Sequence, residues 1–242
     1  MLEIKTQGQQ PITADSTLPA RPPEPATNSV VAPKESGLVV PIRSLGENHR
    51  GRIADHLLSL DAQDRYYRFG FSAQDEQIVR YVDDLNFERD EIFGIYNRRL
   101  SLIAMAHLAF SMDMAHNSAA EFGVSVLPKA RGRGFGGRLF ERAAMHARNR
   151  GVKTIFVHAL SENTAMLRIA SHAGALIERD GVESQGHLSL PPATLDTQLT
   201  EIVQEQMAQT NYQFKVHAKQ FKDTLDRLQA VWQTVGQASR AD

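Results

Sequence analysis

The chain has 242 residues, and its 27 lysines and arginines nearly balance its 28 aspartates and glutamates, which leaves a formal net charge of -1. That balance gives no global reason to expect nucleic acid or an acidic membrane surface as a partner. No cysteine is present, which excludes disulfides, thiolate metal sites and a cysteine nucleophile. No apolar run approaches the roughly 20 residues that cross a bilayer, so we expect a cytoplasmic protein with no membrane partner.

Residues 1–37 are predicted to form a disordered N-terminal arm. Most of the prolines of the chain fall in or just after this segment, and it contains no aromatic residue. It shows no sustained apolar period of either 2 or 3.6 residues. Such a segment cannot bury enough apolar surface to offset the entropy of ordering it.

Residues 38–192 alternate between extended and helical patterns, which predicts one α+β domain. Runs of β-type or alternating residues indicate the strands, apolar stripes with a period of 3.6 indicate the helices, and glycines follow the last two helices. The predicted strands span 38–43, 91–96, 102–110, 120–127, 154–159, 176–179 and 187–190, and the predicted helices span 46–60, 74–85, 135–150 and 163–172.

Residues 193–242 are predicted to form a helical extension, as one long helix or two in tandem. No glycine interrupts the segment before Gly236, and its second half has the apolar spacing of a coiled coil. This pattern favours self-association or a partner-binding helix, and the alternative is a helical hairpin folded onto its own domain. The coiled-coil positions are Phe214, Ala218, Phe221, Leu225, Leu228, Trp232 and Val235.

A glycine-rich segment, Arg131-Gly132-Arg133-Gly134-Phe135-Gly136-Gly137-Arg138, lies between the strand over 120–127 and the next helix. Its glycines let the backbone approach a ligand, and the helix N-terminus that follows favours an anion. Residues 129–153 also carry a local excess of lysine and arginine over acidic residues. We therefore expect a phosphate-bearing ligand here. A P-loop would need lysine and a hydroxyl residue at the end of the glycines, and neither is present.

The pattern Arg131-x-x-Gly134-x-Gly136, after a strand and at the start of a helix, resembles the pyrophosphate-binding signature of the GNAT superfamily of acyl-CoA N-acyltransferases. The resemblance covers about residues 38–190. It implies a mixed, mostly antiparallel sheet, splayed between its fourth and fifth strands and flanked by helices, with acetyl-CoA as cosubstrate and no metal. The cofactor-binding residues that it implies are Val124, Val126, Leu127, Arg131, Gly132, Arg133, Gly134, Phe135, Gly136, Gly137, Arg138 and Asn163.

Glu121 is the candidate general base. The strand Ala120-Glu121-Phe122-Gly123-Val124-Ser125-Val126 looks like the one that carries the glutamate base in bacterial protein-lysine acetyltransferases of this superfamily. Glu121 shares a face with Gly123 and Ser125, which leave room beside it, and we expect apolar neighbours to desolvate its carboxylate. The alternative is that Glu121 pairs with an arginine such as Arg68 and only supports the fold.

The resemblance implies direct transfer of an acetyl group from acetyl-CoA to an amine, with a protein lysine slightly preferred over a small amine such as a polyamine. Ala170 stands where many members have the tyrosine that protonates the departing thiolate, so the general acid is left open. The alternative function is a non-catalytic acyl-CoA-binding sensor that acts through its C-terminal helix.

Overall fold

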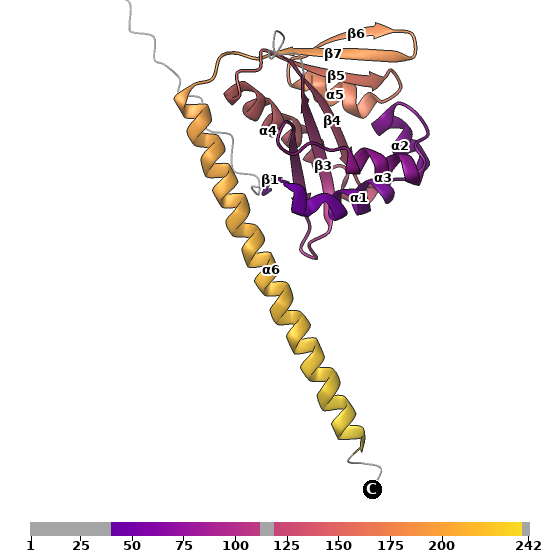
Figure 1. Cartoon of the computed structure of the whole chain (residues 1–242), viewed down its shortest axis with the longest axis vertical. Helices are drawn as coiled ribbons and strands as arrows, with labels where there is room; N and C mark the ends of the chain where they lie inside the picture. The colour runs from indigo at the N-terminus through magenta and orange to yellow at the C-terminus, as the bar shows by residue number, and fades with distance from the viewer. Residues whose placement is uncertain (1–39, 112–118, 239–242) are drawn as a thin grey trace, which may run out of the picture. The chain divides into compact units, whose positions relative to one another are not determined.

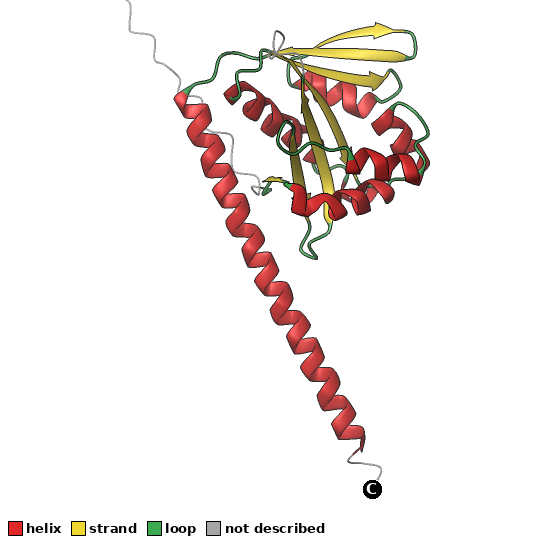
Figure 2. Ribbon diagram, viewed as in Figure 1, coloured by secondary structure: helices red, strands yellow, loops and turns green. Residues whose placement is uncertain are grey.

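The computed structural model describes residues 40–111 and 119–238. Within them, seven strands form one mixed sheet in the order β1-β2-β3-β4-β5-β7-β6, flanked by helices (Figures 1 and 2). The strands are β1 (Arg43–Ser44), β2 (Glu91–Tyr96), β3 (Leu102–Phe110), β4 (Ala119–Val126), β5 (Thr154–Leu160), β6 (Leu176–Asp180) and β7 (Glu183–Ser189). The α-helices are α1 (Arg50–Leu58), α2 (Ala62–Phe69), α3 (Asp75–Asp83), α4 (Phe135–Asn149), α5 (Thr164–His172) and α6 (Leu195–Ala238), and short 3-10 turns span Glu47–His49 and Pro128–Ala130.

The sheet opens between β4 and β5. These strands run parallel and pair only from Ala119 opposite Thr154 to Glu121 opposite Phe156, although both continue well beyond those residues. The other neighbouring strands pair antiparallel. The expected splay between the fourth and fifth strands is confirmed. Glu121 is the last residue of β4 that pairs with β5, so it lies at the vertex of the splay.

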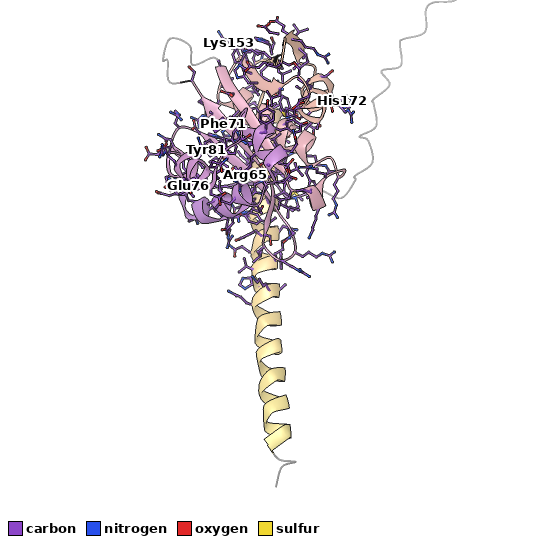
Figure 3. All side chains as sticks on the ribbon, turned by 90° about the vertical axis from the view of Figure 1, so that its right-hand side faces the viewer. Arg65, Phe71, Glu76, Tyr81, Lys153 and His172 are labelled. Carbon is purple, nitrogen blue, oxygen red and sulfur yellow. The ribbon has the colours of Figure 1, made fainter. Side chains whose placement is uncertain are left out.

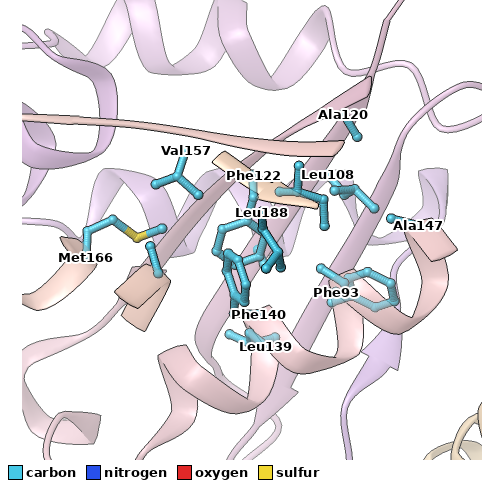
Figure 4. Close-up of a cluster of buried hydrophobic side chains, with 14 of the residues drawn as sticks. Phe93, Leu108, Ala120, Phe122, Leu139, Phe140, Ala147, Val157, Met166 and Leu188 are labelled. Carbon is cyan, nitrogen blue, oxygen red and sulfur yellow. The ribbon is translucent and has the colours of Figure 1, made fainter. Parts of the chain in front are cut away.

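Two apolar clusters cover the two faces of the sheet. One packs α4 and α5 against β2–β5, and its centre includes Phe122 and Phe140, whose rings meet edge to face at 4.8 Å (Figure 4). The other packs α1 and α3 against the opposite face, around Ile53, Ile78 and Met105. Because side chains alternate between faces, odd-numbered residues of β4 point toward the helices α1 and α2.

Most of the predicted elements are confirmed, but two predicted strands have other bounds and one helix was not predicted. The strand expected over 38–43 is reduced within the described residues to Arg43–Ser44, because Pro41 has no N–H to donate to a ladder. The helix α2 was not predicted, and none of its eight residues is fully buried. The last strand, β7, begins at Glu183 rather than at 187, because its buried positions include Ser184 and Gly186.

The helical extension is one continuous helix, so the hairpin alternative is wrong. Its first half packs on the domain through polar contacts: Arg142 of α4 binds Glu201 at 2.7 Å and Glu205 at 3.2 Å, and Lys215 donates to the carbonyl of Tyr96 at 3.0 Å. The coiled-coil side chains from Phe221 onward and the N-terminal arm over 1–37 lie outside the described part of the structure. None of the described helices is long and apolar enough to cross a membrane.

Candidate active site

The glycine-rich segment forms a backbone cradle at the start of α4. Gly132 and Gly134 adopt φ values of 75° and 72°, a left-handed conformation that side chains with a Cβ disfavour. Gly134 is the N-cap, and no side chain there bonds to the first turn of the helix. The first N–H groups of a helix have no partner within it, so those of α4 are available to an anion.

Space lies in front of this cradle. A Cβ added at Gly132, Gly134 or Gly137 would meet no other atom within 4 Å. A Cβ added at Gly136, by contrast, would lie 2.7 Å from the side chain of Ile169 on α5. The open glycines face a ligand site, whereas Gly136 allows α4 to approach α5.

The backbone of β4 supplies further donors. The N–H of Leu127 bonds to the carbonyl of Ile103 on β3 at 3.0 Å. Because bonding directions alternate along an antiparallel strand, Val124 and Val126 then point their N–H groups away from β3, into the gap left by β5. Leu127 was expected among the residues that bind the cofactor, but its N–H is already used within the sheet.

A pocket of about 570 Å³ joins the cradle, the splayed edge of β4, α2 and the start of α5. It brings together most of the residues expected to bind the cofactor. The expected residues that line it are Val124, Val126, Arg131, Gly132, Gly134, Phe135, Gly136, Gly137 and Asn163. The structure leaves Leu127, Arg133, Arg138 and Glu121 off its lining.

Glu121 lies at the vertex of the splay and contacts His158 of β5, which lines the pocket. Its Oε1 is 3.3 Å from Nδ1 of His158, and the Glu121 side chain is 59% exposed, so the expected apolar desolvation is absent. The amide nitrogen of Gln185 donates to Nε2 of His158 at 2.8 Å. Nδ1 of His158 therefore carries the proton that points to Glu121. The expected alternative, a pair between Glu121 and Arg68, is not among the described ion pairs.

Two further expected positions are on α5. The side-chain oxygen of Asn163 caps α5 by accepting from the N–H of Met166 at 3.1 Å, which leaves its NH2 group for the pocket. Ala170 is fully buried, and a Cβ added at Gly186 of β7 would lie 3.6 Å from the Cβ of Ala170. Because β7 packs this closely on α5, position 170 has no room for a tyrosine.

The helix α2 provides pocket residues that sequence reasoning missed. They include Asp64, Tyr67 and Arg68, of which only Arg68 was considered from the sequence, as an ion-pair partner of Glu121. Arg131 forms an ion pair with Asp64 and also donates to the carbonyl of Val126, so its side chain joins α2 to β4. The sequence does carry a signal for α2, since Asp61 caps its start by accepting from the N–H of Asp64 at 2.8 Å and Gly70 ends it at a φ of 78°.

Ser125 of β4 also lines the pocket, and its hydroxyl is fixed from behind. Nδ1 of the buried His56 bonds to the carbonyl of Leu102 at 2.9 Å and must be the donor there. Nε2 of His56 is then the acceptor for the hydroxyl of Ser125, at 2.8 Å. The oxygen of Ser125 therefore presents only lone pairs to a ligand.

The residues present fit acetyl-CoA. The cradle offers backbone donors and open space to a pyrophosphate, and the free edge of β4 offers N–H groups to the pantetheine arm and the thioester carbonyl. Among the side chains that the structure describes, which end at residue 220, no group of three or more histidines and acidic residues has the geometry to hold a metal ion.

Comparison with known proteins shows what the domain is similar to. Residues 55–174 match the sequence profile of the Acetyltransferase (GNAT) family. The fold is similar to the GNAT domain of S. lividans PAT, with 19% identity, a TM-score of 0.54, and coverage of 62% of this chain and 89% of that one. It is also similar to the acetyltransferase of GNAT family from Streptococcus pneumoniae, with 11% identity, a TM-score of 0.51, and coverage of 62% and 98%. A comparison with curated protein sequences gives no match.

The chain therefore contains a GNAT acetyltransferase domain. The domain is an acyl-CoA-dependent N-acetyltransferase, and acetyl-CoA is its cosubstrate.

Proposed function

We propose that the domain transfers the acetyl group of acetyl-CoA directly to a primary amine, with Glu121 as the general base. The acceptor is a protein lysine or a small amine. The observation that carries the proposal is the place of Glu121, at the vertex of the splay and 3.3 Å from His158 of the pocket lining. A carboxylate at this point adjoins the β4 edge on which the thioester would lie.

The reaction balances without any further group. A primary amine arrives as ammonium, and its proton passes to the carboxylate of Glu121. The nitrogen then attacks the thioester carbonyl carbon, and the N–H of Val124 stabilises the oxyanion that forms. As the carbon–sulfur bond breaks, the electron pair leaves with sulfur and the nitrogen loses its second proton to water, which gives the neutral amide. The thiolate of CoA takes a proton from water, and Glu121 returns its proton to the solvent. His158 donates from Nδ1 to Glu121 and so fixes the orientation of the carboxylate.

The test is the release of CoA thiol by the full chain, measured with acetyl-CoA and a panel of amines and lysine peptides. Glu121→Gln removes the base but keeps the shape, and we expect kcat/KM to fall by about 10²–10⁴-fold with acetyl-CoA binding unchanged. Glu183→Gln, at the exposed start of β7, is the matched control and should behave as the wild type. Equal rates for Glu121→Gln and the wild type would contradict the proposal.

One observation favours the second candidate function, a sensor that acts through α6. The helix α4 begins at the cradle, and its Arg142, His146 and Asn149 hold Glu201 of α6 at 2.7, 2.6 and 2.6 Å. A ligand at the cradle therefore contacts the same helix that anchors α6. Acetyl-CoA binding that changes the hydrogen exchange of α6, with no transfer to any amine, would support the sensor in place of the enzyme.

A further inference from the structure

Arg68 of α2 lies directly on β4 at the pocket. Gly123 makes room for it, because a Cβ at Gly123 would lie 3.0 Å from both Cζ and Nη1 of Arg68. Both residues line the pocket. Gly123 also shares a strand face with Glu121 and Ser125, so the guanidinium lies between the proposed base and the hydroxyl that His56 fixes.

A chain of hydrogen bonds holds this guanidinium from behind. Arg68 donates to the phenol oxygen of Tyr81 at 2.7 Å, the phenol contacts Nδ1 of His107 at 2.7 Å, and Nε2 of His107 contacts Asp90 at 3.1 Å. Figure 3 labels Tyr81 on α3, together with Arg65 of the neighbouring α2. Burial would raise the pKa of Asp90, but hydrogen bonds from Arg89, His107 and the N–H of Phe110 hold it well below its usual range.

These contacts fix every proton in the chain. The carboxylate of Asp90 can only accept, so Nε2 of His107 donates to it. In a neutral imidazole that donates from Nε2, Nδ1 can only accept, so the hydroxyl of Tyr81 donates to Nδ1 of His107. The donors therefore run in one direction, from the pocket to the buried acid.

Arg68 keeps unused donors at the pocket. Its Nη1 lies 3.0 Å from the position of a Cβ at Gly123 in the pocket lining and makes no hydrogen bond to the described residues, since the bond to Tyr81 uses Nη2. Nε is buried without a partner, and among the described residues Arg68 takes part in no ion pair. Arg65, on the same helix, is instead satisfied by Asp75 at 2.7 Å and by three backbone carbonyls. An arginine that has no carboxylate partner in the protein and keeps free N–H groups is suited to bind the carboxylate of a ligand.

We propose that Arg68 binds a carboxylate of the acceptor, so that the preferred substrate is an amine with a carboxylate a few bonds away. This inference rests on the proposed amine acetylation. Gly123 is two residues from Glu121, or about 7 Å at ~3.3 Å per residue along a strand, and it is about 10 Å from Val126, beyond which the cradle begins. An anion at Arg68 is therefore near the base and away from the phosphates of the cosubstrate.

Two kinds of acceptor share this chemistry: a free amino acid, and a lysine beside an acidic residue in a peptide. A polyamine does not, because it would place a second cation against Arg68 without a carboxylate to pair with it. The chain from Tyr81 to Asp90 consists of positioning residues, which act on the substrate only through Arg68.

The test uses two pairs of amines, and the members of each pair differ only in the carboxylate. The first pair is an L-amino acid and its α-amide. The second pair is a lysine peptide that has Glu beside the lysine and the same peptide with Gln in place of Glu. Spermidine is added as an acceptor without an anion. Binding to the CoA-saturated full chain is measured by calorimetry, and transfer is measured as kcat and KM with acetyl-CoA. In at least one pair, we expect the carboxylate member to bind at least about tenfold more tightly and to have the lower KM.

Arg68→Gln should make the two members of that pair equal by raising KM for the carboxylate member, and Arg68→Lys should restore part of the difference. Tyr81→Phe should raise the same KM severalfold and leave kcat unchanged, an effect that a purely structural role would not give. Arg80→Gln, an exposed arginine of α3, is the matched control and should bind as the wild type. Circular dichroism checks that each variant folds.

Wild-type protein that binds and acetylates both members of every pair equally would overturn the inference and leave the proposed function standing. A loss of kcat in Arg68→Gln that is equal for both members would also overturn it. Carboxylate-selective binding that Arg68→Gln abolishes, without transfer to any amine, would support the inference and overturn the proposed function.

Discussion

The hydroxyl of Ser125 donates a hydrogen bond of 2.8 Å to Nε2 of His56, behind the wall of the pocket. Burial lowers the pKa of the His56 imidazole to about 4, and the positive charge of Arg68 acts in the same direction. His56 is therefore neutral at pH 7 and is too weak a base to activate Ser125 as a nucleophile. The pair instead fixes the hydroxyl as an acceptor for an N–H group of a ligand.

This pair predicts a dependence of stability on pH. The pKa of His56 is about 4 when folded and about 6.5 when unfolded, so the unfolded chain binds more protons between these values. The contribution of His56 to the free energy of unfolding is present above pH 6.5 and is lost as pH falls toward 4, by about 3 kcal/mol in all. Urea unfolding at several pH values should show this slope in the wild type and a weaker one in His56→Gln.

The control for that measurement is His172→Gln, because His172 is exposed at the end of α5. It should keep the slope of the wild type. Parallel pH profiles for the wild type and His56→Gln would contradict the prediction. Only the slopes are compared, since the amide in His56→Gln also changes stability at every pH.

The anchor of α6 predicts a large effect at Glu201. Burial would raise its pKa, but hydrogen bonds from His146, Asn149 and Arg142 lower it to about 2. Its stabilising effect is therefore present above pH 4.5 and is lost as pH falls toward 2. Glu201→Gln leaves the buried Arg142 with Glu205 alone, and we expect a loss of about 3 kcal/mol in the free energy of unfolding at pH 7.

Glu141→Gln is the matched control, since Glu141 lies on the exposed face of α4. We expect it to change the free energy of unfolding by less than about 0.5 kcal/mol. If both variants unfold at the same urea concentration, the contacts of Glu201 do not anchor α6.

Self-association through α6 stays a prediction, and exposed apolar side chains on the described half of the helix are consistent with it. Leu199, Ile202 and Phe214 are 63%, 58% and 71% exposed. We expect the full chain to form a dimer in light scattering, and we expect Ile202→Gln with Phe214→Gln to shift it toward the monomer. A wild-type chain that is monomeric at all concentrations tested would contradict the prediction.

Most of the fold could be predicted because its periodic elements are strongly patterned. β2 and β3 were predicted with the bounds that the structure gives, and Gly151 and Gly174 take φ values of 80° and 88° where the helices were expected to end. Two of the failures concern elements with little buried apolar surface: α2 buries none of its residues, and two of the buried positions of β7 are Ser184 and Gly186. The shortened first strand has another cause, the missing N–H of Pro41.

The site was predictable where it depends on local backbone chemistry. The cradle follows from glycines next to a helix N-terminus, and these residues do line one pocket. Arg68, His158 and the pair of Ser125 with His56 depend on contacts between elements distant in sequence, which no local pattern encodes. The exposure of Glu121 was missed for the same reason, since it depends on where β5 leaves β4.

The central claim is that acetyl-CoA binds with its pyrophosphate at the cradle, and calorimetric titration of acetyl-CoA into two glycine variants tests it most directly. Gly134→Glu places a carboxylate at the first turn of α4. Gly151→Glu is the control: it lies beyond the other end of the helix, and its φ of 80° is close to the 72° of Gly134, so both variants put a side chain on a left-handed backbone. We expect the wild type and Gly151→Glu to bind with affinities within about twofold, and Gly134→Glu to lose at least about 100-fold, because like charges in contact cost several kcal/mol. Gly134→Glu that binds acetyl-CoA as tightly as the wild type would contradict the account.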